Sequence, residues 1–177
     1  SAAANNIAES GTVQITATQN RIAGTDTTVN LSTTNVTTSA GDYNAPGAIT
    51  ITAGSTSGSV NFTPVNDSVD EDNESLMIQI SSVSGGESAA AGTPQQISVV
   101  INDDDTAGFN LSTTSVSVNE SGTTSQNVTV VLNTKPSGNM VLDLTHNDPS
   151  EASISPSSLT FTTGNWNTAQ SLTVTAL

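Results

Sequence analysis

The sequence predicts an all-β protein built from two copies of one sandwich fold. Apolar residues alternate with polar residues in short runs, which are bounded by Gly, Asn, Asp, Pro and Ser. No long stretch shows the period of a helix. The pattern of the first part returns roughly 110 residues later, so the two parts are interpreted as copies.

Six alternating runs predict the strands of the first copy. Thr occupies many of the intervening positions, as suits a pleated surface with one face in water. The apolar residues of these runs are Val13, Ile15 and Ala17; Val29 and Leu31; Ile49 and Ile51; Val60 and Phe62; Leu76, Ile78 and Ile80; and Ile97, Val99 and Ile101.

Five further runs predict strands in the second copy. They are Val116 and Val118; Val128, Val130 and Leu132; Leu142 and Leu144; Leu159 and Phe161; and Leu172 and Val174. The acidic run that ends at Asp105 marks the boundary, so we predict domains at 1–105 and 106–177.

The second copy is expected to be incomplete. Glu9-Ser10-Gly11 matches Glu120-Ser121-Gly122, and on this alignment the chain stops opposite Val65. Everything that matches residues 66–105, including two strands, is then missing from the second copy, and the first copy has no equivalent of residues 109–118. Either the chain was cut from a longer array or neighbouring subunits supply the strands, since an open sandwich has unpaired edges.

Composition excludes several classes of function. The net charge of the 177 residues is −14, and Arg21 and Lys135 are the only basic residues, which argues against nucleic-acid binding and docking on anionic membranes. There is no Cys for a disulfide, and no apolar stretch approaches the length of a membrane span. His146 beside Asp148 has no marked nucleophile, so we expect no enzyme. With Ser1 in first place, we interpret the chain as a mature protein, a processed piece or an excised segment.

Half of the acidic residues fall in two segments, 66–74 and 103–105, and each segment lies at the end of a predicted strand. Such dense like charges repel unless they are solvated or neutralised. Carboxylate oxygens in this number suit Ca²⁺ better than Mg²⁺, which keeps its waters, or Zn²⁺, which prefers His and Cys. A solvated acidic loop remains the alternative. An EF-hand fits less well, because Ser75 stands where its Gly is needed and the flanks are strands.

These motifs, in this order, resemble the Calx-beta domain. The resemblance covers residues 7–105, whereas 106–177 resemble only the first part of such a domain. The segments that carry it are Glu9-Ser10-Gly11, Ala40-Gly41-Asp42-Tyr43, Asp67 through Glu71 and Glu74 to Ile80, and Asp103-Asp104-Asp105.

The resemblance implies tandem immunoglobulin-like Greek-key β-sandwiches, the second one incomplete, with several Ca²⁺ ions at one tip of the first. The implied ligands are Glu9, Asp42, Asp67, Glu71, Glu74, Asp103, Asp104 and Asp105, with Asp70 and Asp72 as additions. In the second copy only Glu120, Asp148 and Glu151 remain, and they make a weak site.

The resemblance and the composition together indicate the bacterial surface type of this family. We therefore expect a Ca²⁺-stabilised structural repeat of an extracellular adhesin or fibre, with neighbouring repeats or identical subunits as partners. Strand complementation between subunits would build a filament. The alternative is a Ca²⁺-dependent module that recognises glycans or a host surface, for which Trp166 is the one aromatic hint. A calcium sensor of a transporter is a third reading.

Overall fold

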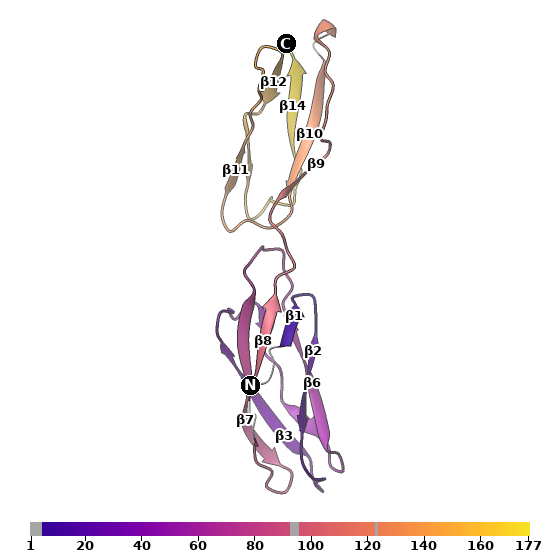
Figure 1. Ribbon diagram of the computed structural model, residues 1–177, viewed down its shortest axis with the longest axis vertical. Coiled ribbons are helices and arrows are strands. Elements are labelled where there is room, and N and C mark those ends of the chain that lie inside the picture. Colours follow the sequence, from indigo (N-terminus) through magenta and orange to yellow (C-terminus); the bar gives the residue numbers. More distant parts are fainter. Residues whose placement is uncertain (1–4, 93–95, 123) are drawn as a thin grey trace. The chain divides into compact units, whose positions relative to one another are not determined.

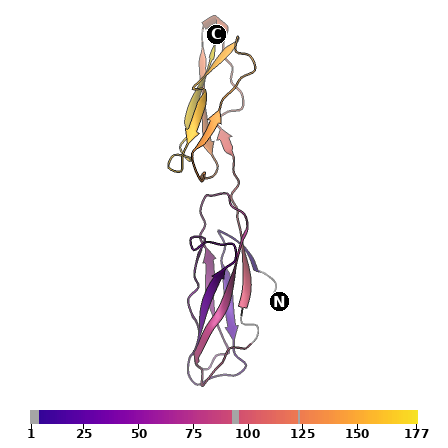
Figure 2. The same ribbon diagram turned by 90° about the vertical axis from the view of Figure 1, so that its left-hand side faces the viewer.

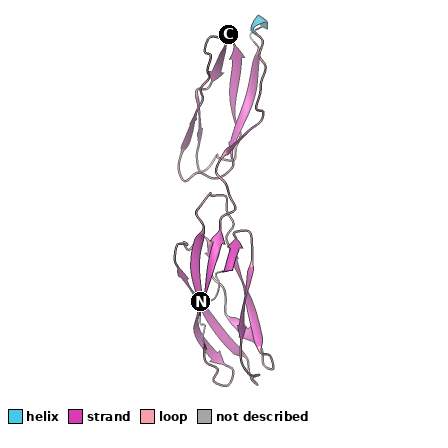
Figure 3. Ribbon diagram, in the orientation of Figure 1, coloured by secondary structure: helices cyan, strands magenta, loops and turns pink. Residues whose placement is uncertain are grey.

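The computed structural model describes residues 5–92, 96–122 and 124–177. Within these ranges the regular elements are strands, apart from the short 3-10 helix η1 (Glu120–Gly122) (Figure 3). The chain divides into two compact units. Unit 1 comprises Ser1–Asp67 and Glu71–Asp104, and unit 2 comprises Ser68–Asp70 and Asp105–Leu177. No helix among the described residues is long and apolar enough to cross a membrane.

The larger sheet of unit 1 has five strands in the order β1-β8-β7-β3-β5 (Figure 1). Its strands are β1 (Asn5–Ala8), β3 (Thr27–Asn35), β5 (Ile49–Ile51), β7 (Glu74–Gly85) and β8 (Gln96–Asn102). β1 pairs with β8 in parallel, and the other neighbours are antiparallel.

The second sheet of unit 1 faces the first (Figure 2). Its strand order is β2-β6-β4. Its strands are β2 (Val13–Thr18), β6 (Ser57–Pro64) and β4 (Tyr43–Asn44). β2 is at the margin of this sheet, so its outer edge has no strand partner among the described residues. All six runs that the alternation predicts for the first copy lie in strands of unit 1.

The core of unit 1 lies between the two sheets because the inward positions of their strands are apolar. Its buried members are Ile7, Phe62, Leu76, Ile78, Val99 and Ile101. Phe62, Leu76 and Val99 are completely buried. Burial of one such side chain stabilises the fold by about 1.5–3 kcal/mol. This core fixes the sheet ends that carry the acidic residues.

Unit 2 has a four-stranded sheet, β12-β14-β10-β9, and a separate pair, β11-β13. The strands are β9 (Phe109–Leu111), β10 (Ser125–Leu132), β11 (Met140–Asp143), β12 (Ala152–Ser155), β13 (Ser158–Phe161) and β14 (Gln170–Ala176). The buried core comprises Val128, Val130, Leu132, Leu159, Phe161 and Leu172.

The pairing in unit 2 repeats part of the pairing in unit 1. β10, β14 and β12 pair as β2, β6 and β4 do, and β11 pairs with β13 as β3 pairs with β5. The described part of unit 2 has no strands that correspond to β7 and β8. These two strands are the ones for which the sequence alignment finds no match in the second copy.

The predicted strand around Val116 and Val118 is wrong, because residues 112–119 form no strand. The strand of this region is instead the short β9, at Phe109–Leu111. The segment directly before Glu120 corresponds to β1, so the first copy does have an equivalent of residues 116–118, contrary to the sequence alignment; in unit 1 this strand is held by hydrogen bonds to β8. Unit 2 has no described counterpart of β8, so Val116 and Val118 have no neighbouring strand with which their backbone could form hydrogen bonds.

Candidate metal centre

Strand directions bring the acidic residues of unit 1 to one end of its sandwich. Glu74 at the start of β7 lies opposite Ile101 near the end of β8, because these strands are antiparallel. β1 runs parallel to β8 with Ala8 opposite Asn102, so Glu9 emerges at that same end. The residues that follow β8 start with Asp103. Segments far apart in the sequence therefore deliver carboxylates to one place.

Asp42, Glu71 and Glu74 form the first group of possible ligands. One carboxylate oxygen from each lies within 4.8 Å of the others. Ser39 positions Asp42: its hydroxyl donates a hydrogen bond of 2.7 Å to Asp42 Oδ1, and its amide donates to Oδ2. The oxygens are close enough to share one cation.

Glu9, Asp104 and Asp105 form the second group, with carboxylate oxygens again within 4.8 Å of one another. Glu9 is only 5% exposed, and its Oε2 atom has no hydrogen-bond partner among the described residues. Asp103 Oδ1 is likewise buried without such a partner. An unsatisfied buried polar atom costs about 1–3 kcal/mol, more when it is charged. A bound cation would remove this cost.

Hydrogen bonds from neighbouring loops hold the acidic side chains in place. The Ser10 hydroxyl donates to Asp104 Oδ2 at 2.8 Å, and the Glu71 amide donates to Asp103 Oδ2 at 3.2 Å. The Asp103 amide in turn donates to Asn73 Oδ1 at 3.1 Å. The loop before β7 and the end of β8 are thereby tied together.

Mutual repulsion and desolvation disturb the protonation of these groups. Burial, together with a hydrogen bond and charge from Asp42, raises the pKa of Glu74 to about 7. Burial likewise raises the pKa of Glu71, and the charge of Asp42 adds to it. Burial also raises the pKa of Glu9, against an opposing backbone hydrogen bond from Asp67. In the absence of a cation, the carboxylates of this site therefore repel one another.

Asp42 differs from its neighbours. Its partial burial acts to raise its pKa, but hydrogen bonds from Ser39 and Glu74 outweigh that effect and hold the pKa below the usual value. Asp42 therefore loses its proton at a lower pH than Glu74, and below about pH 7 the proton of the hydrogen bond between the two carboxyl groups belongs to Glu74. Arrival of a divalent cation would displace that proton.

The donor set suits a hard cation. Ca²⁺ takes six to eight oxygen ligands in flexible geometry. His146, the one His of the sequence, belongs to unit 2, and there is no Cys. Structural Zn²⁺ sites are built from His and Cys, so the centre does not fit Zn²⁺.

Not every predicted ligand joins the two groups. Asp67 lies near Glu9, since its charge and its backbone hydrogen bond both act on that carboxyl. Asp70 and Asp72 are exposed and belong to neither group, and Asp70 lies in the short segment that is part of unit 2. Ser39 and Asn73 support the site without a motif that marks them in the sequence, and Ser10 lies in the Glu9-Ser10-Gly11 match but was not predicted to hold a ligand. The contacts of Ser10 and Asn73 join segments far apart in the sequence, whereas Ser39 acts within its own loop.

The acids predicted for the second copy do not form a comparable centre. Glu120 and Glu151 share a hydrogen bond, which together with the charge of Glu120 raises the pKa of Glu151. Asp148 instead accepts hydrogen bonds from the hydroxyl and amide of Ser150. Within the described part of unit 2 by itself, no three acidic residues converge. Trp166 packs against the core of unit 2 and is half-buried.

Comparison with known proteins identifies the family. The model of the Calx-beta domain matches residues 4–105 and 102–175. The chain belongs to the Calx-beta domain family. A search of curated proteins gives no significant match.

Solved structures show the same tandem architecture. The crystal structure of CBD12 from CALX1.2 matches with a TM-score of 0.50 and 18% identity, over 98% of this chain and 71% of that chain. The calcium binding domain CBD12 of CALX1.1 matches with a TM-score of 0.51 and 22% identity, over 98% and 72%. The apo form of the Calx CBD1 domain matches at 0.50 and 24%, over 57% of this chain and 90% of that chain. At these identities the likeness establishes the fold of this Calx-beta tandem.

Proposed function

We propose that unit 1 binds Ca²⁺ at the acidic end of its sandwich. The observation that carries the proposal is the buried Oε2 of Glu9, which has no hydrogen-bond partner among the described residues and lies among convergent carboxylates. The groups in unit 1 comprise Asp42, Glu71 and Glu74 on one side and Glu9 and Asp104 on the other. The calcium binding domains named among the similar structures support the choice of cation.

Binding would stabilise the fold by neutralising this end of the sandwich. Glu9 follows β1, Glu74 begins β7 and Asp103 follows β8, so ions held there would fasten three adjacent strands of the larger sheet. A ligand that binds the folded state alone adds RT ln(1 + [Ca²⁺]/Kd) to stability, or about 2.7 kcal/mol at a hundredfold excess over Kd.

We further propose that the chain is a structural repeat of an extracellular adhesin or fibre, with neighbouring repeats or identical subunits as its partners. The composition supports this role: there are two basic residues, no Cys and a net charge of −14. The tandem of Calx-beta domains supports it as well. A calcium-stiffened spacer needs only the binding and packing described above.

Strand complementation would complete unit 2. In unit 1, β7 pairs with β3 and β8 pairs with β1. The corresponding elements of unit 2, β11 and residues 116–119, both lack strand partners on that side among the described residues. One added β-hairpin would satisfy both, and we propose that a neighbouring repeat or subunit supplies it.

Thermal unfolding and light scattering on the full chain test both proposals. With millimolar Ca²⁺ we expect a higher melting temperature than with chelator, and this difference should shrink when Asp42 and Glu71 are changed to Asn and Gln. Asp143→Asn is the matched control, because this exposed carboxylate lies in β11 of unit 2 and belongs to neither group. An unchanged melting temperature would refute calcium binding. Monomers at all concentrations would refute complementation between subunits.

A further inference from the structure

The loop between β2 and β3 carries an exposed basic residue directly before an exposed apolar one. Arg21 is exposed and Ile22 is 62% exposed, and both lie within residues 19–26, which form no strand. Arg21 makes no ion pair with a described residue. Neither side chain belongs to the buried core of unit 1 or to the acidic groups. The pair is therefore available to a partner that recognises a basic residue.

Basic residues are so scarce in this chain that a protease specific for them has almost no choice of bond. Arg21 and Lys135 are the only two in the sequence. Lys135 is followed by Pro136, which has a fixed φ and no N–H, and proteases of the trypsin class do not cleave before Pro. Arg21 is followed by Ile22, so Arg21–Ile22 is the one bond of the 177-residue sequence that such an enzyme accepts.

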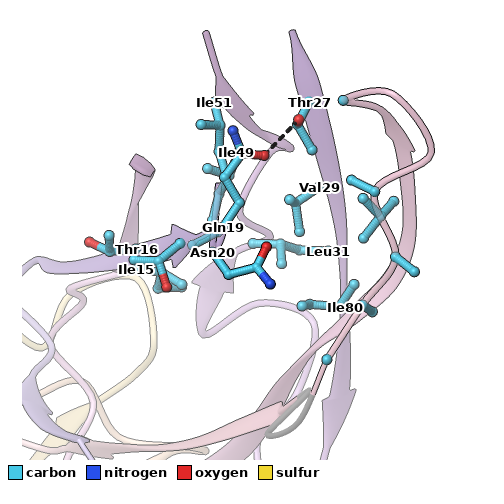
Figure 4. A pocket seen from close by; sticks show the side chains of 18 of the residues that line it. Ile15, Thr16, Gln19, Asn20, Thr27, Val29, Leu31, Ile49, Ile51 and Ile80 are labelled. Carbon is cyan, nitrogen blue, oxygen red and sulfur yellow. Dashed lines mark hydrogen bonds between the residues drawn. The ribbon is translucent and has the colours of Figure 1, made fainter. Parts of the chain in front are cut away.

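The backbone around this bond is held on both sides but not in the middle. On one side, Gln19 lines a pocket of about 560 Å³ in unit 1, and its side-chain oxygen accepts a hydrogen bond of 2.9 Å from the Thr27 hydroxyl (Figure 4). On the other side, the Ala23 carbonyl accepts a hydrogen bond of 3.0 Å from the Gly54 amide. Residues 20–22 make no hydrogen bond to another described residue. A protease can therefore engage the exposed bond without breaking hydrogen bonds at the residues beside it.

The position of this bond decides what a cut would separate. β2 and β3 belong to different sheets of unit 1, and residues 19–26 are the covalent connection between them. β1 and β2 precede the bond, whereas β3 to β8 follow it. A cut would leave β1 and β2 attached to the rest of unit 1 by non-covalent contacts alone.

Those contacts include the acidic end of the sandwich. β1 pairs with β8, β2 pairs with β6, and Ile7 of β1 is buried in the core. The Glu9 amide donates to the Asn102 carbonyl at 3.1 Å, and the Glu9 carboxylate belongs to the same group as that of Asp104. Glu9 precedes the Arg21–Ile22 bond and Asp104 follows it, so a cation held by both carboxylates would bridge the two parts.

We propose that the Arg21–Ile22 bond is a processing site for a serine endopeptidase of the trypsin class, and that cleavage makes the attachment of β1 and β2 depend on Ca²⁺. Arg21 is the one basic side chain of unit 1, and the specificity pocket of such an enzyme carries an aspartate that pairs with it. The bond between the Arg21 carbonyl carbon and the Ile22 nitrogen breaks, and one water is consumed. Arg21 gains a carboxylate and Ile22 an ammonium group. The calcium dependence rests on the proposed function of the acidic groups, whereas the cut does not.

Limited digestion of the full chain with trypsin, in buffer with Ca²⁺, tests the cut. N-terminal sequencing should give one new N-terminus, at Ile22. Intact-mass spectrometry should give two fragments whose masses sum to that of the chain plus one water. The Arg21→Lys variant should be cut at the same bond, and Arg21→Gln should abolish cleavage.

A matched variant separates the loop from mere exposure of a basic side chain. Thr16 is exposed, but its backbone is part of β2 and is paired with β6. In a chain that already carries Arg21→Gln, the substitution Thr16→Arg adds an exposed basic residue inside a strand. This double variant should stay intact while it is folded and should be cut once it is denatured, because a paired strand does not open locally as a loop does. Circular dichroism checks that the variant is folded.

Size-exclusion chromatography of the cleaved chain, after trypsin has been inhibited, tests the attachment. In millimolar Ca²⁺ the two fragments should elute together. After transfer to chelator, the fragment that contains β1 and β2 should separate. In the cleaved Glu9→Gln variant, this fragment should separate at Ca²⁺ concentrations at which the cleaved unchanged protein retains it, because one ligand of the bridging cation is weakened.

Several results would overturn the proposal. These are an intact Arg21–Ile22 bond after digestion of the folded chain, or equal cleavage of the folded double variant. Stoichiometric inhibition of trypsin with little cleavage would instead make the loop an inhibitor. Retention of the fragment in chelator would overturn the calcium dependence.

The melting temperature of the uncut chain, with Ca²⁺ and with chelator, reports on the metal centre separately. If Ca²⁺ raises it while the cleaved fragment stays bound in chelator, the inference fails and the proposed function stands. If Ca²⁺ leaves it unchanged, the proposed function fails and the calcium dependence of the attachment fails with it. The site of the cut is then still decided by the new N-terminus.

Discussion

Replacing Glu9 with Gln is expected to stabilise the calcium-free protein and to destabilise the calcium-loaded protein. Glu9 is 5% exposed, and its Oε2 has no hydrogen-bond partner among the described residues. Gln removes the buried charge, and its amide can donate to a neighbouring carboxylate such as Asp103. The cost of an unsatisfied buried group is about 1–3 kcal/mol, so a gain of about 1–2 kcal/mol is expected without Ca²⁺.

The loaded protein should respond in the opposite direction. Loss of one charged ligand that weakens Ca²⁺ binding about tenfold lowers the stabilisation at saturating Ca²⁺ by about 1.4 kcal/mol. For a domain of this size, each kcal/mol moves the melting temperature by about 4–8 °C. The melting temperatures of the variant with Ca²⁺ and with chelator should therefore lie closer together than those of the unchanged protein.

Differential scanning calorimetry of the Glu9→Gln variant, with Ca²⁺ and with chelator, measures both shifts. Isothermal titration gives the change in affinity directly. Asp143→Asn removes an exposed carboxylate from β11 and should leave both values unchanged. If Glu9→Gln lowers the melting temperature equally in both conditions, Glu9 has a purely structural role and the reasoning about its unsatisfied oxygen is refuted.

Four further predictions concern acidity, ion selectivity and the core. Without Ca²⁺, the raised pKa of Glu74 favours the folded state at low pH, so stability should fall as pH rises from about 4.5 to about 7, by about 1–2 kcal/mol after solvent screening; a chelator melt series that rises with pH over this range would contradict the sign. Calcium affinity should instead weaken below pH 7, as protons compete at Glu74, which titration calorimetry at pH 5.5 and 8 would measure. Mg²⁺ at equal concentration should raise the melting temperature much less than Ca²⁺, since it keeps its waters; equal stabilisation would argue against this ligand set. Phe62→Ala should cost about 3–5 kcal/mol and lower the unfolding transition of unit 1 alone, because this side chain is completely buried there; a loss below 1 kcal/mol by chemical denaturation would contradict it.

The strands of unit 1 could be predicted from the sequence because each presents one apolar face. Ile49 and Ile51, for example, alternate with polar residues and are both buried in β5. Val116 and Val118 alternate in the same way but form no strand, since a strand also needs a neighbour in its sheet. The alternation of apolar and polar residues shows which face of a strand would be buried, but it does not show which strand would pair with it.

The candidate metal centre could be predicted from the sequence only in part. The clusters of acids at strand ends were visible, and the antiparallel pairing of β7 with β8 explains why they meet. Asp42 and Glu9 are predicted as ligands only by the family resemblance, because neither residue lies in a run of acidic residues. Ser39, which holds Asp42 by two hydrogen bonds, carried no signal at all. The hydrogen bonds from Ser10 to Asp104 and from the Asp103 amide to Asn73 join segments far apart in the sequence, so they depend on the folded path of the chain.

The parallel pairing of β1 with β8 has a mechanical consequence. Pulling the start of β1 and the end of β8 apart loads the whole ladder from Asn5–Val99 to Ala8–Asn102 in shear. All of its hydrogen bonds then resist together, whereas a hairpin pulled open at its ends yields one bond at a time. The candidate ions lie where the load would leave β8, beside Asp103 and Asp104. Calcium would thus act as a clamp on the strand that transmits tension, and the rupture force of unit 1 should follow the calcium concentration around it.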